Sequence, residues 1–172
     1  MNEGKAFYFV RHGQTDHHRD QDSISLNQKG IQQAMDFRPW LKNLTFSDVL
    51  CSPLQRARET CRILLEHSDK KEIYSHNLRE CTTAVWKSMT DPSDTRNTPE
   101  AEAFREQVRA AFVEIAAFSG TPLIVAHGGI HFALCELLQI KNHAKYIDNC
   151  QLAYFTFTGR HWSAHFPDLS LR

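Results

Sequence analysis

Two histidines in this sequence each follow a short apolar segment and precede a glycine. His12 follows the segment 7–10, and His127 follows the segment 123–126. Short apolar runs of this kind are typical of buried strands. Because ligands of open α/β sheets bind beyond the carboxyl ends of the strands, both imidazoles are expected to project into one crevice. The alternative for each histidine is a turn residue beside a permissive glycine.

The sequence around these histidines resembles a known family. Residues 11–15 read RHGQT, which matches the RHGxT signature of the histidine phosphatase (phosphoglycerate-mutase-like) superfamily. That signature alone is a moderate signal, but five segments in family order carry the resemblance through most of the chain. The other four are LNQKGIQQA at 26–34, SPLQRARET at 52–60, LRE at 78–80 and VAHGG at 125–129.

The resemblance implies a phosphoryl-transfer site. By the family's mechanism, a ring nitrogen of His12 attacks phosphorus and becomes a transient phosphohistidine, which requires a neutral imidazole. The planar guanidinium groups of Arg11 and Arg56 suit phosphate oxygens. His127 is expected to be a further donor, cationic when phosphate is bound, and backbone N–H groups at the helix start after Gly128 can add to anion binding. Because arginines neutralise the phosphate charge, the resemblance implies no metal and no other cofactor.

The same resemblance assigns the proton transfers to Glu80. This residue would protonate the leaving oxygen and then take a proton from the water that attacks the phosphohistidine. The sequence departs from the family pattern here, because CTTAVWK at 81–87 stands where family phosphatases often have a glycine and a W-E-G element. A solvated surface glutamate is the alternative. In that case the acid would have to be sought among Asp16, Asp20 and Asp22.

The family motif decides between two neighbouring arginines. The apolar face of the helix expected after Ser52-Pro53 lies closer to Arg58 than to Arg56. The family's R-A pair nevertheless selects Arg56, which is followed by Ala57. We therefore expect Arg56 at the site and Arg58 on the surface.

Specificity is expected where the resemblance is weakest, after Thr15 and in residues 81–98. Gln14, Thr15 and His18 are candidate substrate contacts, although His18 stands where many members have an asparagine that touches the phosphate. His17 and His18 are adjacent and have no partner at ligand spacing, so a metal centre is not predicted.

Composition places the chain among folded globular proteins. It has 172 residues, of which 41% are hydrophobic and 23% charged, and residues 1–172 are expected to form a single catalytic domain. The formal net charge is +0, which disfavours nucleic acid or an anionic membrane as a partner. No segment approaches the roughly 20 apolar residues of a membrane span. The 5 cysteines form no CxxC pair, so reduced thiols in a cytoplasmic protein are expected.

Alternating strands and helices predict an α/β fold. We expect a single-domain three-layer sandwich, phosphoglycerate-mutase-like, in which helices cover both faces of a mostly parallel sheet. The segment 87–98 has the composition of a surface loop. The expected strands are 7–10, 49–51, 73–74 and 123–126, with a hairpin around 158–160. The expected helices start after Asn27, at Ser52-Pro53 (to about residue 66), at Thr98-Pro99 and at Phe132 (to Leu138).

The leading interpretation is a cofactor-independent phosphomonoesterase. Its partner would be a phosphorylated small molecule or phosphopeptide, with inorganic phosphate as product. A phosphoglycerate-type mutase uses similar catalytic residues, but family mutases are longer, with insertions that close over the site. A non-catalytic phosphate-binding module is the other alternative. Such a module would tolerate loss of His12 or Glu80, and both are present.

Overall fold

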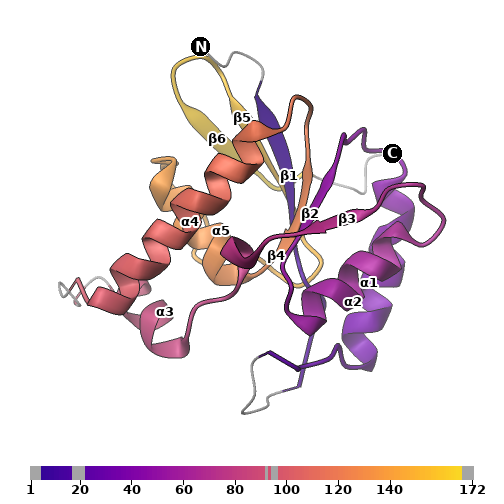
Figure 1. The fold of residues 1–172 in the computed structure, drawn as a ribbon, viewed down its shortest axis with the longest axis horizontal. Coiled ribbons are helices and arrows are strands. Elements are labelled where there is room, and N and C mark those ends of the chain that lie inside the picture. Colours follow the sequence, from indigo (N-terminus) through magenta and orange to yellow (C-terminus); the bar gives the residue numbers. More distant parts are fainter. Residues whose placement is uncertain (1–4, 17–21, 92, 94–96, 168–172) are drawn as a thin grey trace.

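A six-stranded sheet forms the centre of the computed structural model, which describes residues 5–16, 22–91, 93 and 97–167. The strands are β1 (Ala6–Arg11), β2 (Val49–Cys51), β3 (Glu72–Tyr74), β4 (Leu123–Ala126), β5 (Leu152–Phe157) and β6 (Trp162–His165). Their order is β3-β2-β4-β1-β5-β6 (Figure 1). The first four strands pair in parallel, and β5 is antiparallel to β1 and β6. The sheet is therefore mostly parallel, and the predicted hairpin forms one edge.

Helices cover both faces of this sheet. Phe7 and Phe9 of β1 belong to the core on one face and Val10 to the core on the other, because successive strand side chains alternate. The helices are α1 (Gln28–Leu41), α2 (Gln55–Leu65), α3 (Thr83–Thr90), α4 (Pro99–Ala117) and α5 (Gly128–Leu137), with a short 3₁₀ helix at His76–Leu78. The helices α1 and α2 lie on one side of the sheet, and α4 and α5 lie on the other (Figure 1). The predicted three-layer arrangement is confirmed.

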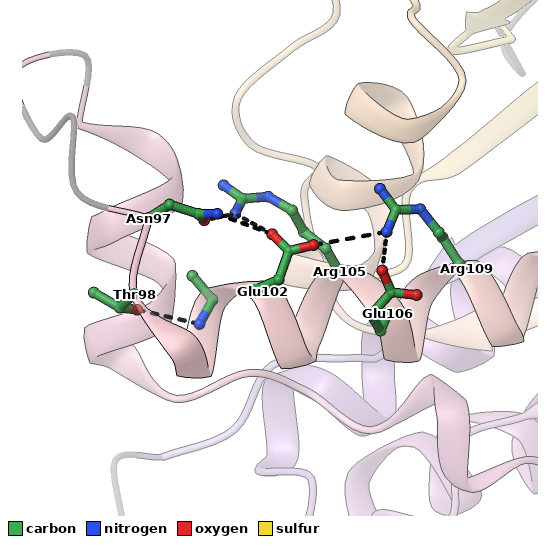
Figure 2. A network of polar contacts seen from close by, with 7 residues as sticks. Asn97, Thr98, Glu102, Arg105, Glu106 and Arg109 are labelled. Carbon is green, nitrogen blue, oxygen red and sulfur yellow. Dashed lines mark hydrogen bonds and ion pairs between the residues drawn. The ribbon is translucent and has the colours of Figure 1, made fainter.

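Side-chain caps start two helices where the sequence predicts them. The Asn27 side chain accepts a hydrogen bond from Gly30 N at 2.8 Å, and Thr98 accepts one from Ala101 N at 3.2 Å. Beside the Thr98 cap, exposed polar side chains form a network along the first half of α4 (Figure 2). Exposed ion pairs of this kind add little stability. The network contains Asn97, Glu102, Arg105, Glu106 and Arg109.

Two other helices begin at residues different from those predicted. The helix expected from Ser52-Pro53 starts at Gln55 and has no side-chain cap. The Ser52 hydroxyl accepts from Leu54 N at 3.3 Å in the turn before the helix and also lies against His127. The helix expected from Phe132 to Leu138 starts at Gly128 and ends at Leu137. His127 is itself the N-cap, so β4 leads almost directly into α5.

Part of the predicted loop over 87–98 is helical. Thr82 caps α3 by accepting from Val85 N at 3.3 Å, and Val85 is buried in the core. The polar residues that indicated a loop begin at Asp91, where α3 ends. Local capping and one buried side chain therefore extend regular structure into this segment.

Candidate active site

The pairing of β1 with β4 brings the two histidines together. Arg11 is in register with Ala126, and His12 N donates to Ala126 O at 3.0 Å. Because the two strands are parallel and adjacent, the residues that follow them lie at the same edge of the sheet. The imidazole centroids of His12 and His127 are 5.1 Å apart, and both side chains are buried. The two rings therefore lie side by side at this edge of the sheet, and we refer to the place where they meet as the crevice.

The main chain sets the tautomer of His12. Its Nδ1 lies 2.7 Å from Gly13 O, and a carbonyl oxygen can only accept, so Nδ1 carries the proton. The lone pair of Nε2 then accepts from Arg56 Nε at 3.2 Å. Burial, followed by the charges of Arg56 and Arg11, lowers the pKa of His12 to about 3. The imidazole is therefore neutral near pH 7, with its lone pair on Nε2.

The two candidate arginines of α2 lie in different places. Arg56 is 3% exposed and contacts His12. Arg58 is exposed, and its guanidinium carbon lies 5.2 Å from the centroid of the Tyr74 ring on the edge strand β3. Thr60 lies one helical turn after Arg56, and its Oγ1 donates a hydrogen bond to Arg56 O at 2.8 Å. The start of α2 is thereby fixed against the crevice.

Two buried nitrogen atoms at the crevice lack partners among the residues that the structure describes. They are Nε of Arg11 and Nδ1 of His127. One other nitrogen of each side chain is anchored, since Arg11 Nη1 donates to Ile147 O at 2.7 Å and His127 Nε2 lies 2.7 Å from Ser52 Oγ. An unpaired buried polar atom is costly unless a ligand satisfies it. An anion in the crevice would accept from the Arg11 guanidinium.

Burial also changes the titration of His127. Desolvation, with the neighbouring His12 and the charge of Arg56 as further causes, lowers its pKa well below the ordinary value. The imidazole is therefore neutral near pH 7 in this structure. The expectation that His127 becomes cationic when phosphate is bound remains a prediction, because a bound dianion would favour the charged form.

The carboxylate of Glu80 lies at the first turn of α5. Its Oε2 accepts from Gly129 N at 3.2 Å, and its Oε1 accepts from Cys81 N at 3.0 Å. Burial raises the pKa of this carboxyl even though these hydrogen bonds and the charge of Arg56 act in the opposite direction. The carboxyl is therefore not a solvated surface group, and its protonated form persists to higher pH than that of an exposed glutamate.

Glycine at position 129 permits this contact. A Cβ there would lie 2.2 Å from Glu80 Oε1, which is closer than two non-bonded atoms approach. A Cβ on Gly128 would instead lie 3.7 Å from Arg11 Nε, which is an ordinary van der Waals distance. The first turn of α5 therefore approaches the Glu80 carboxylate closely at Gly129, whereas Gly128 lies beside Arg11.

Three side chains support the site but were not singled out from the sequence. The Ser52 hydroxyl contacts His127, and Thr60 Oγ1 accepts a hydrogen bond from Gly13 N at 3.0 Å. Asn149 Nδ2 donates to His12 O at 2.8 Å. Ser52 and Thr60 lie within the recognised segment 52–60, so the motif contained a signal for them. Asn149 lies outside every recognised segment.

The candidate substrate loop is described only in part. Gln14 N donates to Gln33 Oε1 at 2.9 Å, and Thr15 forms an isolated bridge with Leu26, so both backbones are fixed beside α1. His18, like His17 and Asp20, lies outside the described residues.

The alternative acids in the described part of the chain have other partners. Asp16 Oδ1 accepts from Asn27 Nδ2 at 2.9 Å, and Asp22 forms an ion pair with Arg79. Within the described ranges, no three His, Cys, Asp or Glu side chains are grouped so that they could hold a metal ion. No helix in those ranges is long and apolar enough to span a bilayer.

Comparison with known proteins identifies the family. The family model of the histidine phosphatase superfamily (branch 1) matches residues 7–168. This chain belongs to the histidine phosphatase superfamily. The adenosylcobalamin/alpha-ribazole phosphatase of Salmonella typhi is 28% identical over 149 residues, which cover 72% of this chain and 74% of that protein.

Solved structures of this superfamily share the fold. The phosphoglycerate mutase of Bacillus anthracis superposes with a TM-score of 0.75 at 20% identity, covering 98% of this chain and 95% of that one. The alpha-ribazole phosphatase of Shigella flexneri gives a TM-score of 0.73 at 18% identity, covering 94% and 95%. The superfamily relatives of this chain thus include both phosphatases and mutases.

Proposed function

We propose that this histidine phosphatase superfamily member is a phosphomonoesterase that needs no metal ion and works through a phosphohistidine on His12. The observation that carries the proposal is the neutral imidazole, whose Nε2 lone pair meets the Arg56 guanidinium in a buried crevice. The unpartnered Nε of Arg11 supports it, because an anion bound beside Nε2 of His12 would accept a hydrogen bond from this N–H group.

The proposed reaction has two steps. Arg11, Arg56, His127 and the backbone at the start of α5 hold the phosphoryl group, while Nε2 of His12 attacks phosphorus and the P–O bond to the leaving group breaks. Glu80, in its protonated form, gives its proton to the leaving oxygen. The resulting carboxylate then accepts a proton from water as that water attacks phosphorus, which releases inorganic phosphate and restores the imidazole.

The substrate would be a phosphorylated small molecule or a phosphopeptide. The activity of one relative supports the first, since that relative is an adenosylcobalamin/alpha-ribazole phosphatase. We also propose a cytoplasmic location, because all five cysteines are free thiols and disulfides are rare in that compartment. Residues 1–172 would act as one catalytic domain.

Turnover of p-nitrophenyl phosphate in the presence of EDTA tests the proposal. The wild-type protein should hydrolyse it, and acid quenching during turnover should trap an acid-labile phosphoryl group. His12→Ala should abolish both signals with the fold intact, whereas His161→Ala, at an exposed histidine near the β5–β6 turn, should change neither. Residual activity of His12→Ala above a few per cent would contradict the assignment.

Further measurements separate the alternatives. A non-catalytic phosphate-binding module would bind inorganic phosphate without turnover. A mutase would convert phosphoglycerate isomers when a bisphosphoglycerate is added and would release little inorganic phosphate. Recovery of activity only after addition of a divalent metal would contradict the metal-independent mechanism.

A further inference from the structure

Three aromatic side chains from different segments meet in one cluster. Trp86 lies on α3, Phe132 on α5 and Tyr146 in the segment before β5. The ring centroids of Trp86 and Phe132 are 5.5 Å apart at an edge-on angle of 70°, and those of Trp86 and Tyr146 are 5.5 Å apart at 43°. We call these three residues the aromatic rim.

Each member of the rim is close in sequence to a group at the site. Tyr146 precedes Ile147, whose carbonyl accepts from Arg11. Phe132 follows Gly129, the donor to Glu80, by about one helical turn. Trp86 lies in the first turn of α3, the helix that follows Glu80. The backbones next to Tyr146 and Phe132 therefore lie close to Arg11 and Glu80, and the Trp86 ring contacts both of these aromatic rings.

The position of Glu80 indicates where the leaving group would lie. A general acid must be within hydrogen-bond reach of the leaving oxygen, so the leaving group extends past Glu80 and away from His12. The segment that follows Glu80 leads into α3 and Trp86. The leaving group of a bound phosphomonoester would thus approach the rim.

Exposure of the rim increases toward solvent. Phe132 is 9% exposed and forms the base, Trp86 is half-buried, and Tyr146 is 61% exposed. Lys145 Nζ lies 5.6 Å from the Tyr146 ring centroid. An exposed, rigid aromatic side chain such as Tyr146 suits stacking, because little conformational freedom is lost when another ring packs on it.

We propose that the aromatic rim stacks on a planar aromatic ring in the leaving group, so that the preferred substrates are phosphomonoesters that carry an aryl group or a nucleobase. This inference rests on the proposed phosphomonoesterase function. A purely structural role predicts something different. If Tyr146 only covered Trp86, its removal would lower stability without changing the preference among ligands.

Binding of phosphonates tests the proposal without depending on turnover. Phenylalkylphosphonates with short methylene linkers are compared by calorimetry with alkylphosphonates of the same linker length. The phenyl compounds should bind about tenfold more tightly at the best linker length, which is a typical contribution of one aromatic stack. Cyclohexylalkylphosphonates, which are apolar but not planar, should not reproduce this gain.

Variants locate the preference on the rim. Tyr146→Ala should lose most of the phenyl preference while its affinity for methylphosphonate stays within about twofold of the wild-type value, and Tyr146→Phe should retain the preference. Tyr74→Ala is the matched control, because Tyr74 is 41% exposed on β3, at the far edge of the sheet from the β5–β6 hairpin. That variant should change neither affinity.

Three results would overturn the inference. Equal binding of phenyl and cyclohexyl compounds would show that no stacking occurs, and an unselective effect of Tyr146→Ala would show a structural role. Failure to bind inorganic phosphate at all would overturn the proposed function and this inference with it, whereas phosphate binding without ring preference would overturn this inference alone. A nucleoside phosphonate that binds more tightly than every phenyl compound would identify the ring as a nucleobase, and the reverse order would identify it as a simple aryl group.

Discussion

One hydrogen-bond partner adjacent in sequence and one 44 positions away set the tautomer and the charge of the His12 imidazole. The carbonyl of Gly13 holds the proton on Nδ1, and the charges of Arg56 and Arg11 join burial in keeping the ring neutral. No base is needed to free the lone pair of Nε2. The imidazole is thus neutral over the whole physiological pH range, and any pH dependence of the proposed reaction should come from other groups.

Glu80→Gln should separate substrates by their leaving groups. The variant keeps the size of the side chain but cannot donate the carboxyl proton. We expect kcat/KM to fall about 100- to 10,000-fold on alkyl phosphates, whose alkoxide needs a proton, and clearly less on p-nitrophenyl phosphate. Steady-state kinetics on the two substrates measure this. Small, equal losses would mean that Glu80 is a bystander.

The pH profile of kcat/KM for the wild-type protein should reveal the titration of Glu80. Because burial raises the pKa of Glu80, the donor form is present at low pH and is lost as pH rises through that raised value. We expect kcat/KM on an alkyl phosphate to decline on this alkaline limb. The limb should be absent in Glu80→Gln, and a limb that persists unchanged would have to come from another group.

Anion binding should distinguish the two arginines of α2. Phosphate, vanadate or tungstate should inhibit competitively and raise the Tm of the wild-type protein, because a ligand that binds only the folded state stabilises it. Arg56→Ala should weaken phosphate binding about 10- to 100-fold, the usual range for a charge-assisted hydrogen bond. Arg58→Ala, at the residue beside Tyr74, should bind phosphate like the wild type. The opposite ranking would mean that the family motif selects the wrong arginine.

At the scale of elements, the start of α5 determines where Glu80 can lie. The carboxylate accepts from the second residue of this helix, and the absence of a side chain at Gly129 makes room for it. The parallel pairing of β1 and β4 then brings the same helix start next to His12. The β4–α5 junction and the neighbouring end of β1 therefore bring His12 and Glu80 to the same edge of the sheet.

Two adjacent glycines offer a matched test of this junction. Gly129→Ala should displace the Glu80 carboxylate, because the new Cβ would overlap Oε1, and should lower the free energy of unfolding by about 1–3 kcal/mol. Gly128→Ala introduces only ordinary contacts and should leave the free energy of unfolding within about 0.5 kcal/mol. Urea denaturation of both variants measures the difference. Equal stabilities would show that the helix start shifts without cost.

At the scale of the whole molecule, several buried histidines link stability to pH. Burial lowers the pKa of His12 to about 3 and that of His131 to about 4, and it lowers the pKa of His127 as well. Between these values and about 6.5, the unfolded chain binds more protons than the folded protein. Stability therefore rises with pH in this range and is lost as pH falls. The raised pKa of Glu80 acts with the opposite sign but is a single group.

The urea midpoint should accordingly fall when pH is lowered from 6.5 toward 4. Each fully neutral buried histidine contributes a slope of up to about 1.4 kcal/mol per pH unit. His131→Leu should make the dependence shallower, because His131 packs among Phe9 and Phe155 away from the crevice and leucine cannot titrate. A dependence as steep as that of the wild type would show that His131 is not protonated on unfolding.

Local patterns in the sequence determined the strands and several helix starts. An apolar run that stops at a glycine identifies a strand end without any knowledge of its neighbours, and Asn27 and Thr98 cap their helices through residues only three positions away. Local signals of the same kind placed His12 and His127 at strand ends. Where a distant partner competes, local signals were misleading, as at Ser52, whose hydroxyl lies against His127.

Only the tertiary structure decided how these residues meet. The contact between Arg56 and His12 joins residues 44 positions apart, and that between Glu80 and Gly129 joins residues 49 apart. The tautomer of His12 follows from a local carbonyl, but the direction of its pKa shift follows from burial and from charges on other elements. Burial and long-range hydrogen bonds depend on strand order and helix packing. Residue types and spacing can therefore name the groups of the site, whereas their protonation and relative positions require the folded chain.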